Sequence, residues 1–253
     1  MKRGILPLTI AAILALAGCG GGIPASGPHT TDNASSPVTV FAAASLTAAY
    51  TEIARLDPDL DVRLSFDGSP TLVDQISAGA PADVLATADE ATMERAAEGG
   101  LLAGEPTIFA TTTAVLIVPA GNPAGITGLD ASLEGTKLVV CAAVVPCGAT
   151  ARRIADAAGV TLQPVSEEQK VTDVRGKVVS GEADAGIVFR TDAQAAGDQV
   201  EVLEIPGAQA AATRYPIATV TDAAHPEAAA AFVALVTGVR GQAVLAEHGF
   251  TAP

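Results

Sequence analysis

The stretch Val38–Ala49 sets the pattern that the rest of the chain repeats. It begins with an apolar, β-branched run, passes through a turn of small residues, and continues with apolar positions at helical spacing. The sequence therefore predicts a strand followed by a helix that opens just after Ser45, with Ser45 as its N-cap. The first turn of such a helix has unpartnered N–H groups that suit a small anion. An ordinary strand, turn and helix with a serine cap is the alternative.

Strand and helix patterns alternate along the remainder of the chain, which is typical of an α/β fold with mostly parallel sheets. The expected strands are Leu60–Phe66, Asp83–Ala86, Thr112–Pro119, Lys137–Cys141, Ala185–Phe189, Gln199–Ile205 and Tyr215–Val220, and the expected helices are Pro70–Ala78, Asp89–Glu98, Gly148–Ala158, Val174–Ser180, Pro226–Thr237 and Gly241–His248. A loop rich in Gly, Asn and Pro follows Pro119 and marks a boundary. We expect lobe 1 to comprise 38–116 and 219–253, lobe 2 to comprise 117–218, and a ligand cleft to lie between them.

The N-terminus has the features of a processing signal. Lys2 and Arg3 precede an apolar run that is too short to span a bilayer, and the run ends in Leu-Ala-Gly-Cys at Cys19. This tetrapeptide resembles a bacterial lipobox, so we expect a signal peptide over 1–18, lipidation of Cys19 and a flexible tether over 19–37. The expected location is extracytoplasmic, anchored by lipid to the cell membrane. An ordinary secretory signal with an incidental cysteine is the alternative.

Composition excludes several classes of function. The formal net charge of −14 argues against nucleic-acid binding, although backbone dipoles can still hold an anion locally. The chain has no Trp and 3% aromatic residues, which argues against a sugar platform. Its three histidines, His29, His225 and His248, stand apart from any Gly-x-Ser-x-Gly elbow or metal-ligand spacing. We therefore expect no enzymatic activity, with a secreted hydrolase as the distant alternative.

Three further helix starts are candidates for anion contacts. Ser69 precedes Pro70 and is a candidate N-cap. Cys147 opens a helix next to a glycine, and a cap at Thr172 or Asp173 would leave the N–H of Val174 near a first turn. Arg175 could clamp an anion, but a solvated position or a pair with a carboxylate is the stronger interpretation. Four such helix starts, two in each lobe, would suit a desolvated tetrahedral anion.

Six segments carry a resemblance to a known family. They are V-F-A-A-A-S-L-T, S-F-D-G-S-P-T-L-V-D-Q-I, A-G-A-P-A-D-V, D-V-R-G, A-G-I-V-F and Y-P-I-A-T-V, in this order. Over about residues 38–252 the chain resembles the molybdate/tungstate-binding proteins of ABC importers. The resemblance implies a two-lobed, type II periplasmic-binding-protein fold and an oxyanion held by the N–H and hydroxyl groups of Ser45 and Ser69 and by the N–H groups of Cys147 and Val174.

The same resemblance implies the partners and the chemistry. A permease and an ATPase of an ABC importer would receive the ligand from a monomeric binding protein. Molybdenum would be present only within the oxyanion, with no direct metal ligands and no cofactor. The family often has a ligand-binding tyrosine where this chain has Phe189, so one donor is missing here. The backbone donors would suit sulfate or phosphate as well, and these remain the alternative ligands.

Two cysteines remain after Cys19. Cys141 and Cys147 form an even pair in an oxidising compartment, and we expect a disulfide between them that braces the intervening turn. A reactive thiolate of Cys147 at a helix N-terminus is the alternative.

Overall fold

The structure is a computed structural model, and it describes residues 37–253. These residues belong to one compact unit. The signal peptide expected over 1–18, Cys19, and the tether expected over 19–37 apart from its last residue lie outside the described residues.

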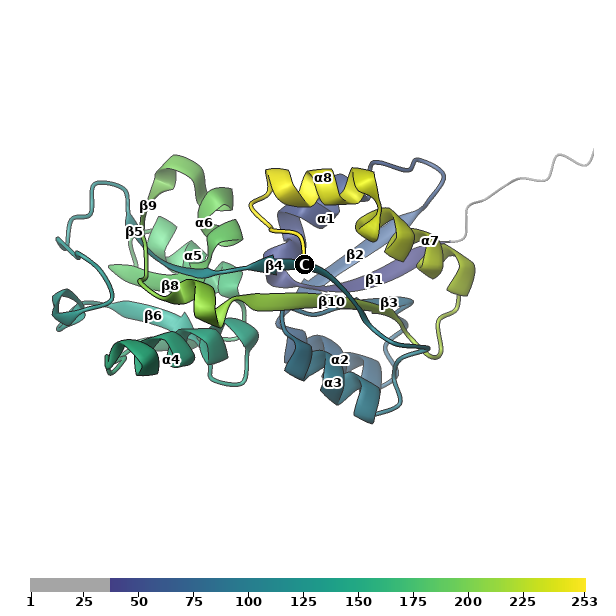
Figure 1. Cartoon of the computed structure of the whole chain (residues 1–253), viewed down its shortest axis with the longest axis horizontal. Helices are drawn as coiled ribbons and strands as arrows, with labels where there is room; N and C mark the ends of the chain where they lie inside the picture. The colour runs from purple at the N-terminus through teal and green to yellow at the C-terminus, as the bar shows by residue number, and fades with distance from the viewer. Residues whose placement is uncertain (1–36) are drawn as a thin grey trace, which may run out of the picture. The chain divides into compact units, whose positions relative to one another are not determined.

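Two five-stranded sheets organise the described part of the chain (Figure 1). The first sheet has the order β2-β1-β3-β10-β4, and the second has the order β7-β6-β8-β5-β9. The strands of the first sheet are β1 (Val38–Ala43), β2 (Val62–Asp67), β3 (Val84–Ala86), β4 (Thr107–Thr112) and β10 (Thr213–Thr219). Those of the second are β5 (Ala114–Pro119), β6 (Leu138–Cys141), β7 (Ser166–Glu168), β8 (Ala185–Phe189) and β9 (Val200–Leu203).

Both sheets are mixed. In the first, β1 is parallel to β2 and β3, whereas β10 is antiparallel to β3 and β4. In the second, β6 is parallel to β7 and β8, whereas β5 is antiparallel to β8 and β9. The α/β class and the two-sheet architecture are confirmed, but the expectation of mostly parallel sheets is wrong. The strands β5 and β10 reach their sheets directly from the other sheet, without the crossover helix that a parallel connection needs.

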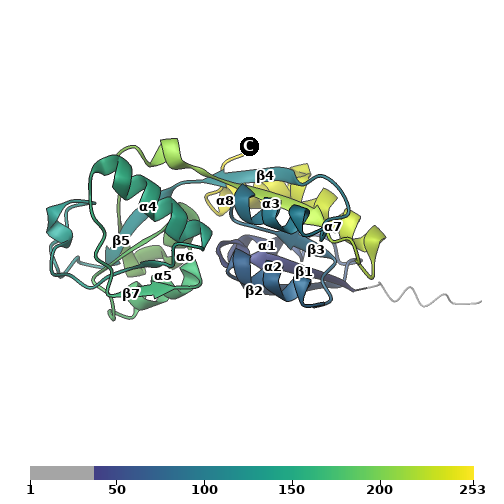
Figure 2. The same cartoon turned by 90° about the horizontal axis from the view of Figure 1, so that it is seen from below.

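Helices cover both faces of each sheet (Figures 1 and 2). In the first sheet α1, α7 and α8 lie on one face, and α2 and α3 lie on the other; in the second, α5 and α6 lie opposite α4. Their bounds are α1 (Thr47–Ile53), α2 (Ser69–Ser77), α3 (Glu90–Glu98), α4 (Pro146–Ala158), α5 (Val171–Val179), α6 (Arg190–Ala196), α7 (Pro226–Thr237) and α8 (Val239–Glu247). Short 3-10 helices are η1 (Ala44–Leu46), η2 (Ala131–Leu133), η3 (Gly197–Gln199) and η4 (Ala208–Ala211).

The chain crosses between the sheets twice. The first crossing is at Thr113, between β4 and β5, and the second is the segment 204–212, between β9 and β10. A boundary at 116/117 would divide β5, and one at 218/219 would divide β10. We therefore place the boundaries between the lobes at the two crossings. From here on, lobe 1 means the first sheet with its helices, and lobe 2 means the second sheet with its helices.

An aromatic cluster lies near the start of β10, just after the second crossing. The ring of Tyr215 packs edge-on against Phe109, Phe250 and the lobe 2 residue Phe189, with centroid distances of 6.2, 5.2 and 6.1 Å. Tyr50 extends the cluster toward α7 through Phe232. All these rings are buried, so the apolar core is continuous across the two lobes next to the crossings.

No single helix in residues 37–253 is long and apolar enough to cross a membrane. The helices α7 and α8 reach that length only as a pair, and they meet at a bend of 56°.

Candidate functional site

Ser45 lies in a 3-10 turn between β1 and α1. The turn η1 comes first and α1 begins at Thr47 with Leu46 as its N-cap, so the expectation that Ser45 caps the helix is wrong. Its hydroxyl oxygen lies 2.9 Å from the hydroxyl oxygen of Tyr215, across 170 residues of sequence. A side chain that bonds a distant strand is unavailable for capping its own helix. Ser45 is 8% exposed.

Ser69 is the first residue of α2, and Gly68 is the N-cap. The expectation that Ser69 is the cap is therefore wrong by one residue. The Ser69 hydroxyl oxygen accepts a hydrogen bond from the backbone N–H of Ala88 at 3.0 Å, which ties the start of α2 to the segment after β3. Because its oxygen accepts that bond, the hydroxyl hydrogen of Ser69 stays available for another acceptor.

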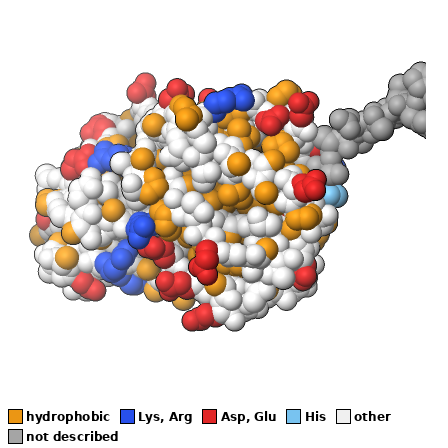
Figure 3. Space-filling model, turned by 45° about the vertical axis from the view of Figure 1, so that its right-hand side comes forward, with side chains coloured by type: hydrophobic (Ala, Val, Ile, Leu, Met, Phe, Trp, Pro, Cys, Tyr) orange, Lys and Arg blue, Asp and Glu red, His pale blue; other side chains and the backbone are white. Residues whose placement is uncertain are grey.

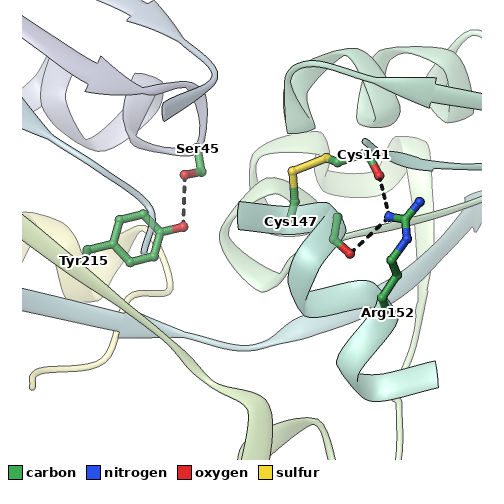
Figure 4. Close-up of a disulfide and its surroundings, with 6 residues drawn as sticks. Ser45, Cys141, Cys147, Arg152 and Tyr215 are labelled. Atoms are coloured by element: carbon green, nitrogen blue, oxygen red, sulfur yellow. Dashed lines mark hydrogen bonds between the residues drawn. A yellow bond between two sulfur atoms is a disulfide. The ribbon is translucent and has the colours of Figure 1, made fainter. Parts of the chain in front are cut away.

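Cys147 is the second residue of α4, and it forms a disulfide with Cys141 at the end of β6 (Figure 4). The helix begins at Pro146, two residues earlier than expected, because proline suits its first position. Arg152 donates hydrogen bonds to the carbonyl oxygens of Cys141 and Gly148, both at 3.4 Å. A Cβ on Gly148 would lie closer than 3.0 Å to the backbone of Cys141 and Ala142, so only glycine fits this turn.

The helix α5 begins at Val171 with Lys170 as its N-cap, so the cap expected at Thr172 or Asp173 is wrong. Val174 is the fourth residue of the helix and is fully buried. Val171 and Lys170, rather than Val174, reach the pocket described next. A role for the N–H of Val174 stays a prediction.

One small pocket gathers residues from both lobes. Ser45, Ser69, Cys147 and Phe189 all line it, and the cavity that they enclose has a volume of about 10 Å³. The full lining is Ala43, Ala44, Ser45, Asp67, Gly68, Ser69 and Ala88 from lobe 1, and Val145, Pro146, Cys147, Lys170, Val171 and Phe189 from lobe 2. Drug-sized ligands occupy several hundred Å³ and a single water molecule about 10–15 Å³, so this site excludes large ligands, and a ligand larger than water needs the lobes to move apart.

A direct contact between the lobes closes one side of the pocket. The ammonium group of Lys170 lies 3.3 Å from a carboxylate oxygen of Asp67, and that same oxygen accepts a hydrogen bond from the N–H of Gly68 at 2.7 Å. The Cα of Gly68 approaches the carbonyl of Gln169 so closely that a Cβ would lie within 3.0 Å of its oxygen. Both contacts join the end of β2 to the start of α5, so the pocket is lined in a closed arrangement of the lobes.

A buried carboxyl group lies behind the pocket. Asp192 in α6 is 2% exposed, and one of its oxygens has no hydrogen-bond partner among the described residues. Burial raises the pKa of Asp192 to about 7, although Arg175 and a backbone hydrogen bond at Phe189 act in the opposite direction. The guanidinium of Arg175 lies 3.9 Å from the other oxygen, so Arg175 faces a carboxylate rather than the pocket.

Burial also raises the pKa of Tyr215 well above its ordinary value, and the nearby carboxylates of Asp192 and Asp89 act in the same direction. The phenol is therefore protonated at neutral pH.

The sequence reasoning missed three of the residues that shape this pocket. Asp67 and Gly68 stand inside the quoted segment S-F-D-G-S-P, and Lys170 stands three residues before the Asp-Val-Arg-Gly segment. Tyr215 opens the segment Y-P-I-A-T-V, but its hydroxyl reaches Ser45 only through the fold. For these three residues and Tyr215, the available sequence signal was their position inside or beside the quoted segments.

The described residues contain no group of three or more His, Cys, Asp or Glu side chains placed to hold a metal ion. On the face drawn in Figure 3, acidic side chains are distributed over the surface and basic ones form a few groups among them. The donors at the pocket are N–H and O–H groups, together with one lysine whose charge is paired. Such a set can replace the hydration of a small anion without a broad basic surface.

The fold and the interlobe pocket define a solute-binding protein. The family described as bacterial extracellular solute-binding protein matches residues 38–251, and the chain belongs to this family. It is 43% identical to the molybdate-binding protein ModA of Mycobacterium tuberculosis H37Rv, over 95% of this chain and 94% of that protein. The resemblance seen in the six sequence segments is thereby confirmed.

Solved structures show the same fold. The periplasmic molybdate-binding protein of Azotobacter vinelandii matches with a TM-score of 0.75 at 20% identity, over 85% of this chain and 99% of that one. The sulfate-binding protein SubI of M. tuberculosis matches with a TM-score of 0.69 at 21% identity, over 85% and 86%. At this level of identity the two structures support the two-lobed binding-protein fold alone.

The disulfide gives a direct chemical prediction. We expect a thiol titration of the unreduced domain, prepared without its lipid anchor, to find no free thiol. Replacing both Cys141 and Cys147 by serine should lower the free energy of unfolding by about 2 kcal/mol, as loop-closure entropy implies for so short a loop. Two reactive thiols in the unreduced protein would contradict the bond.

Proposed function

We propose that this protein captures molybdate, or the closely similar tungstate, in the pocket between its lobes and delivers it to an ABC permease driven by an ATPase. One observation carries the proposal: Ser45 and Ser69 of lobe 1 and Cys147 of lobe 2 line one small pocket. The molybdate-binding name of the relative that is 43% identical supports this ligand. The oxyanion would be the ligand, and no cofactor is needed to hold it.

Each half of the pocket has donors of the right kind. Ser45 and Ser69 would contribute their hydroxyl and N–H groups, and the first turn of α4 would contribute the N–H of Cys147. The N–H of Val174 in α5, a residue outside the pocket lining, is the fourth proposed contact. A hydrogen bond to a charged acceptor contributes roughly 1.5–3 kcal/mol net. Five or six of them, set against an association cost of about 4–15 kcal/mol, allow micromolar or tighter binding.

Phe189 lines the same pocket with an apolar ring. It supplies no donor where the family often has a tyrosine, so the backbone and the serines have to complete the hydrogen bonding of the ligand. A tetrahedral dianion with no proton to donate fits such a set of donors.

Binding would be coupled to closure of the two lobes. An anion that touches both lobes favours the closed state by its differential contacts, and the permease would receive the closed form. The Asp67–Lys170 contact joins the same two lobes next to the ligand. We further propose that the protein lies outside the cytoplasm, anchored through a lipid on Cys19, on the strength of the sequence pattern Leu-Ala-Gly-Cys. That it acts as a monomer is proposed from the family resemblance.

The decisive experiment is a calorimetric titration of the domain, prepared without its lipid anchor, with molybdate, tungstate, sulfate and phosphate in turn. Saturable binding of molybdate or tungstate at micromolar or lower concentration supports the proposal. Preferential binding of sulfate or phosphate would show that the ligand is that oxyanion instead of molybdate. Turnover of a generic ester or phosphate ester would support the hydrolase that the family assignment disfavours.

Replacing Ser45 and Ser69 together by alanine should weaken molybdate binding at least tenfold, because two donors to a charged acceptor are lost. Titration calorimetry measures the change. The matched control replaces Ser77 and Ser180, which are exposed and lie outside the pocket, by alanine. An unchanged affinity in the pocket variant would refute the assignment of the two serines.

A further inference from the structure

Two serines line the pocket, and the hydroxyl oxygen of each lies within hydrogen-bond distance of a partner in the protein. For Ser69 the direction is fixed, because the partner is the backbone N–H of Ala88 and can only donate. For Ser45 the partner is the hydroxyl of Tyr215 at 2.9 Å, and either oxygen could be the donor. The direction of this second bond decides whether the hydrogen of Ser45 points at Tyr215 or into the pocket.

The surroundings of Tyr215 favour the phenol as the donor. Its side chain is fully buried, and Ser45 is its hydrogen-bond partner in the described residues. A buried O–H that fails to donate has an unsatisfied hydrogen, which costs free energy. When an anion occupies the pocket, it accepts a hydrogen bond from the Ser45 hydroxyl. The Ser45 oxygen is then free to accept a hydrogen bond from Tyr215. Two hydroxyls in line polarise each other and strengthen the terminal bond.

Packing fixes the position of the phenol. Its ring touches Phe109 and Phe250 in lobe 1 and Phe189 in lobe 2, all edge-on. Phe189 itself lines the pocket. The Tyr215 hydroxyl is therefore held between the core of lobe 1 and the pocket residue Phe189. Its hydrogen bond to Ser45 restricts rotation of the Ser45 side chain about the Cα–Cβ bond.

We propose that Tyr215 is a positioning residue for the bound oxyanion: its hydroxyl donates to the Ser45 oxygen and thereby turns the Ser45 hydrogen into the pocket. This inference rests on the proposed function and adds to it a residue outside the pocket lining. Ser69 is oriented in the same way, because its hydroxyl oxygen accepts a hydrogen bond from the backbone N–H of Ala88 instead of from a phenol.

A double-mutant cycle tests the proposal. Tyr215→Phe should weaken molybdate binding roughly five- to tenfold in the wild-type background, which corresponds to one hydrogen bond. In a Ser45→Ala background the same change should have little effect, because the hydroxyl that Tyr215 orients is gone. Equal losses in both backgrounds, or unchanged affinity in the single variant, would overturn the proposal.

The matched control is Tyr50→Phe. Tyr50 is also fully buried in lobe 1, and its hydroxyl has no partner among the described residues. This variant should bind as the wild type does, and a loss equal to that of Tyr215→Phe would show that both act through packing alone. A wild-type protein that binds none of the four oxyanions would overturn the proposed function as well, whereas binding that ignores Tyr215 overturns this inference alone.

A second readout needs no change at Tyr215. The chain has two tyrosines, so ¹³C labelling of the tyrosine Cζ atoms gives two signals, and the Tyr50→Phe variant assigns them. Addition of molybdate to the wild type should move the signal of Tyr215, as its hydrogen bond to Ser45 becomes one-directional, and move the signal of Tyr50 less. A titration that saturates while the Tyr215 signal stays in place would overturn the proposal.

Discussion

Gly68→Ala should weaken molybdate binding at least 100-fold while leaving the folded protein close to its original stability. Gly68 has φ −61° and ψ 137°, which alanine adopts without strain, so lobe 1 tolerates the change. In lobe 1 the nearest atom to a Cβ there is the Thr71 side-chain oxygen, at an ordinary 3.8 Å. The clash is with the carbonyl of Gln169 in lobe 2, and neither backbone can yield as a flexible side chain would.

The variant therefore acts on closure rather than on folding. A ligand that gains its affinity by bridging two lobes loses it when the closed state is blocked, and a factor of 100 corresponds to about 2.7 kcal/mol. Titration calorimetry measures the affinity, and thermal unfolding without ligand measures the stability. The control is Gly176→Ala on α5, an exposed position where a Cβ meets nothing within 4 Å. Wild-type affinity in Gly68→Ala would show that ligand binding does not need this closed contact.

Asp192→Asn should stabilise the protein above neutral pH and remove part of its pH dependence. Burial raises the pKa of Asp192 to about 7 from 3.8, so between these two pH values the folded protein keeps a proton that the unfolded chain has lost. Each rise in pH across this window therefore favours the unfolded state. The stability that the protonated carboxyl provides is complete below about pH 4 and is lost by the time the pH has passed 7.

A pKa shift of that size corresponds to a loss of roughly 4 kcal/mol in the free energy of unfolding between pH 4 and pH 8. Chemical unfolding across this range should show the decline in the wild type and a flatter profile in Asp192→Asn, because an amide does not titrate. Groups that face this carboxyl are Arg175 on α5 and Tyr215 on β10. The control is Asp198→Asn at an exposed position in η3. Parallel profiles for Asp192→Asn and the wild type would contradict the prediction.

Most strands and helices were predictable because their signals are local. Short continuous runs of apolar residues predict the central strands, such as Ala185–Phe189, whose bounds agree with β8. The terminal helix expected over Pro226–Thr237 agrees with α7, since a proline at its start and a glycine after its end mark both limits. The helix α6 escaped prediction because Arg190–Ala196 follows β8 directly and has few large apolar residues. The strand β4 escaped because one residue, Thr113, separates it from β5.

Helix starts were predicted less accurately, and for the two serines the errors have one cause. Ser45 and Ser69 look like N-caps by residue type, but the fold engages their oxygens with Tyr215 and with the N–H of Ala88. The helix α5 begins at Val171, three residues before the expected start, with the pocket residue Lys170 as its N-cap. Capping preference is a weak local bias, and a tertiary hydrogen bond outweighs it.

By itself the sequence determined the α/β class, the two-sheet architecture, the family, and the serine and cysteine residues that line the pocket. The physical reason is that the period of apolar residues and the short motifs, which follow one another in a fixed order, are properties of neighbouring residues. Only the tertiary structure decided which groups meet: Ser45 with Tyr215, Asp67 with Lys170, and Gly68 with Gln169. These partners are about 100 or more residues apart in the chain. Their contacts depend on how two independently patterned sheets close on each other, which no local pattern of residues specifies.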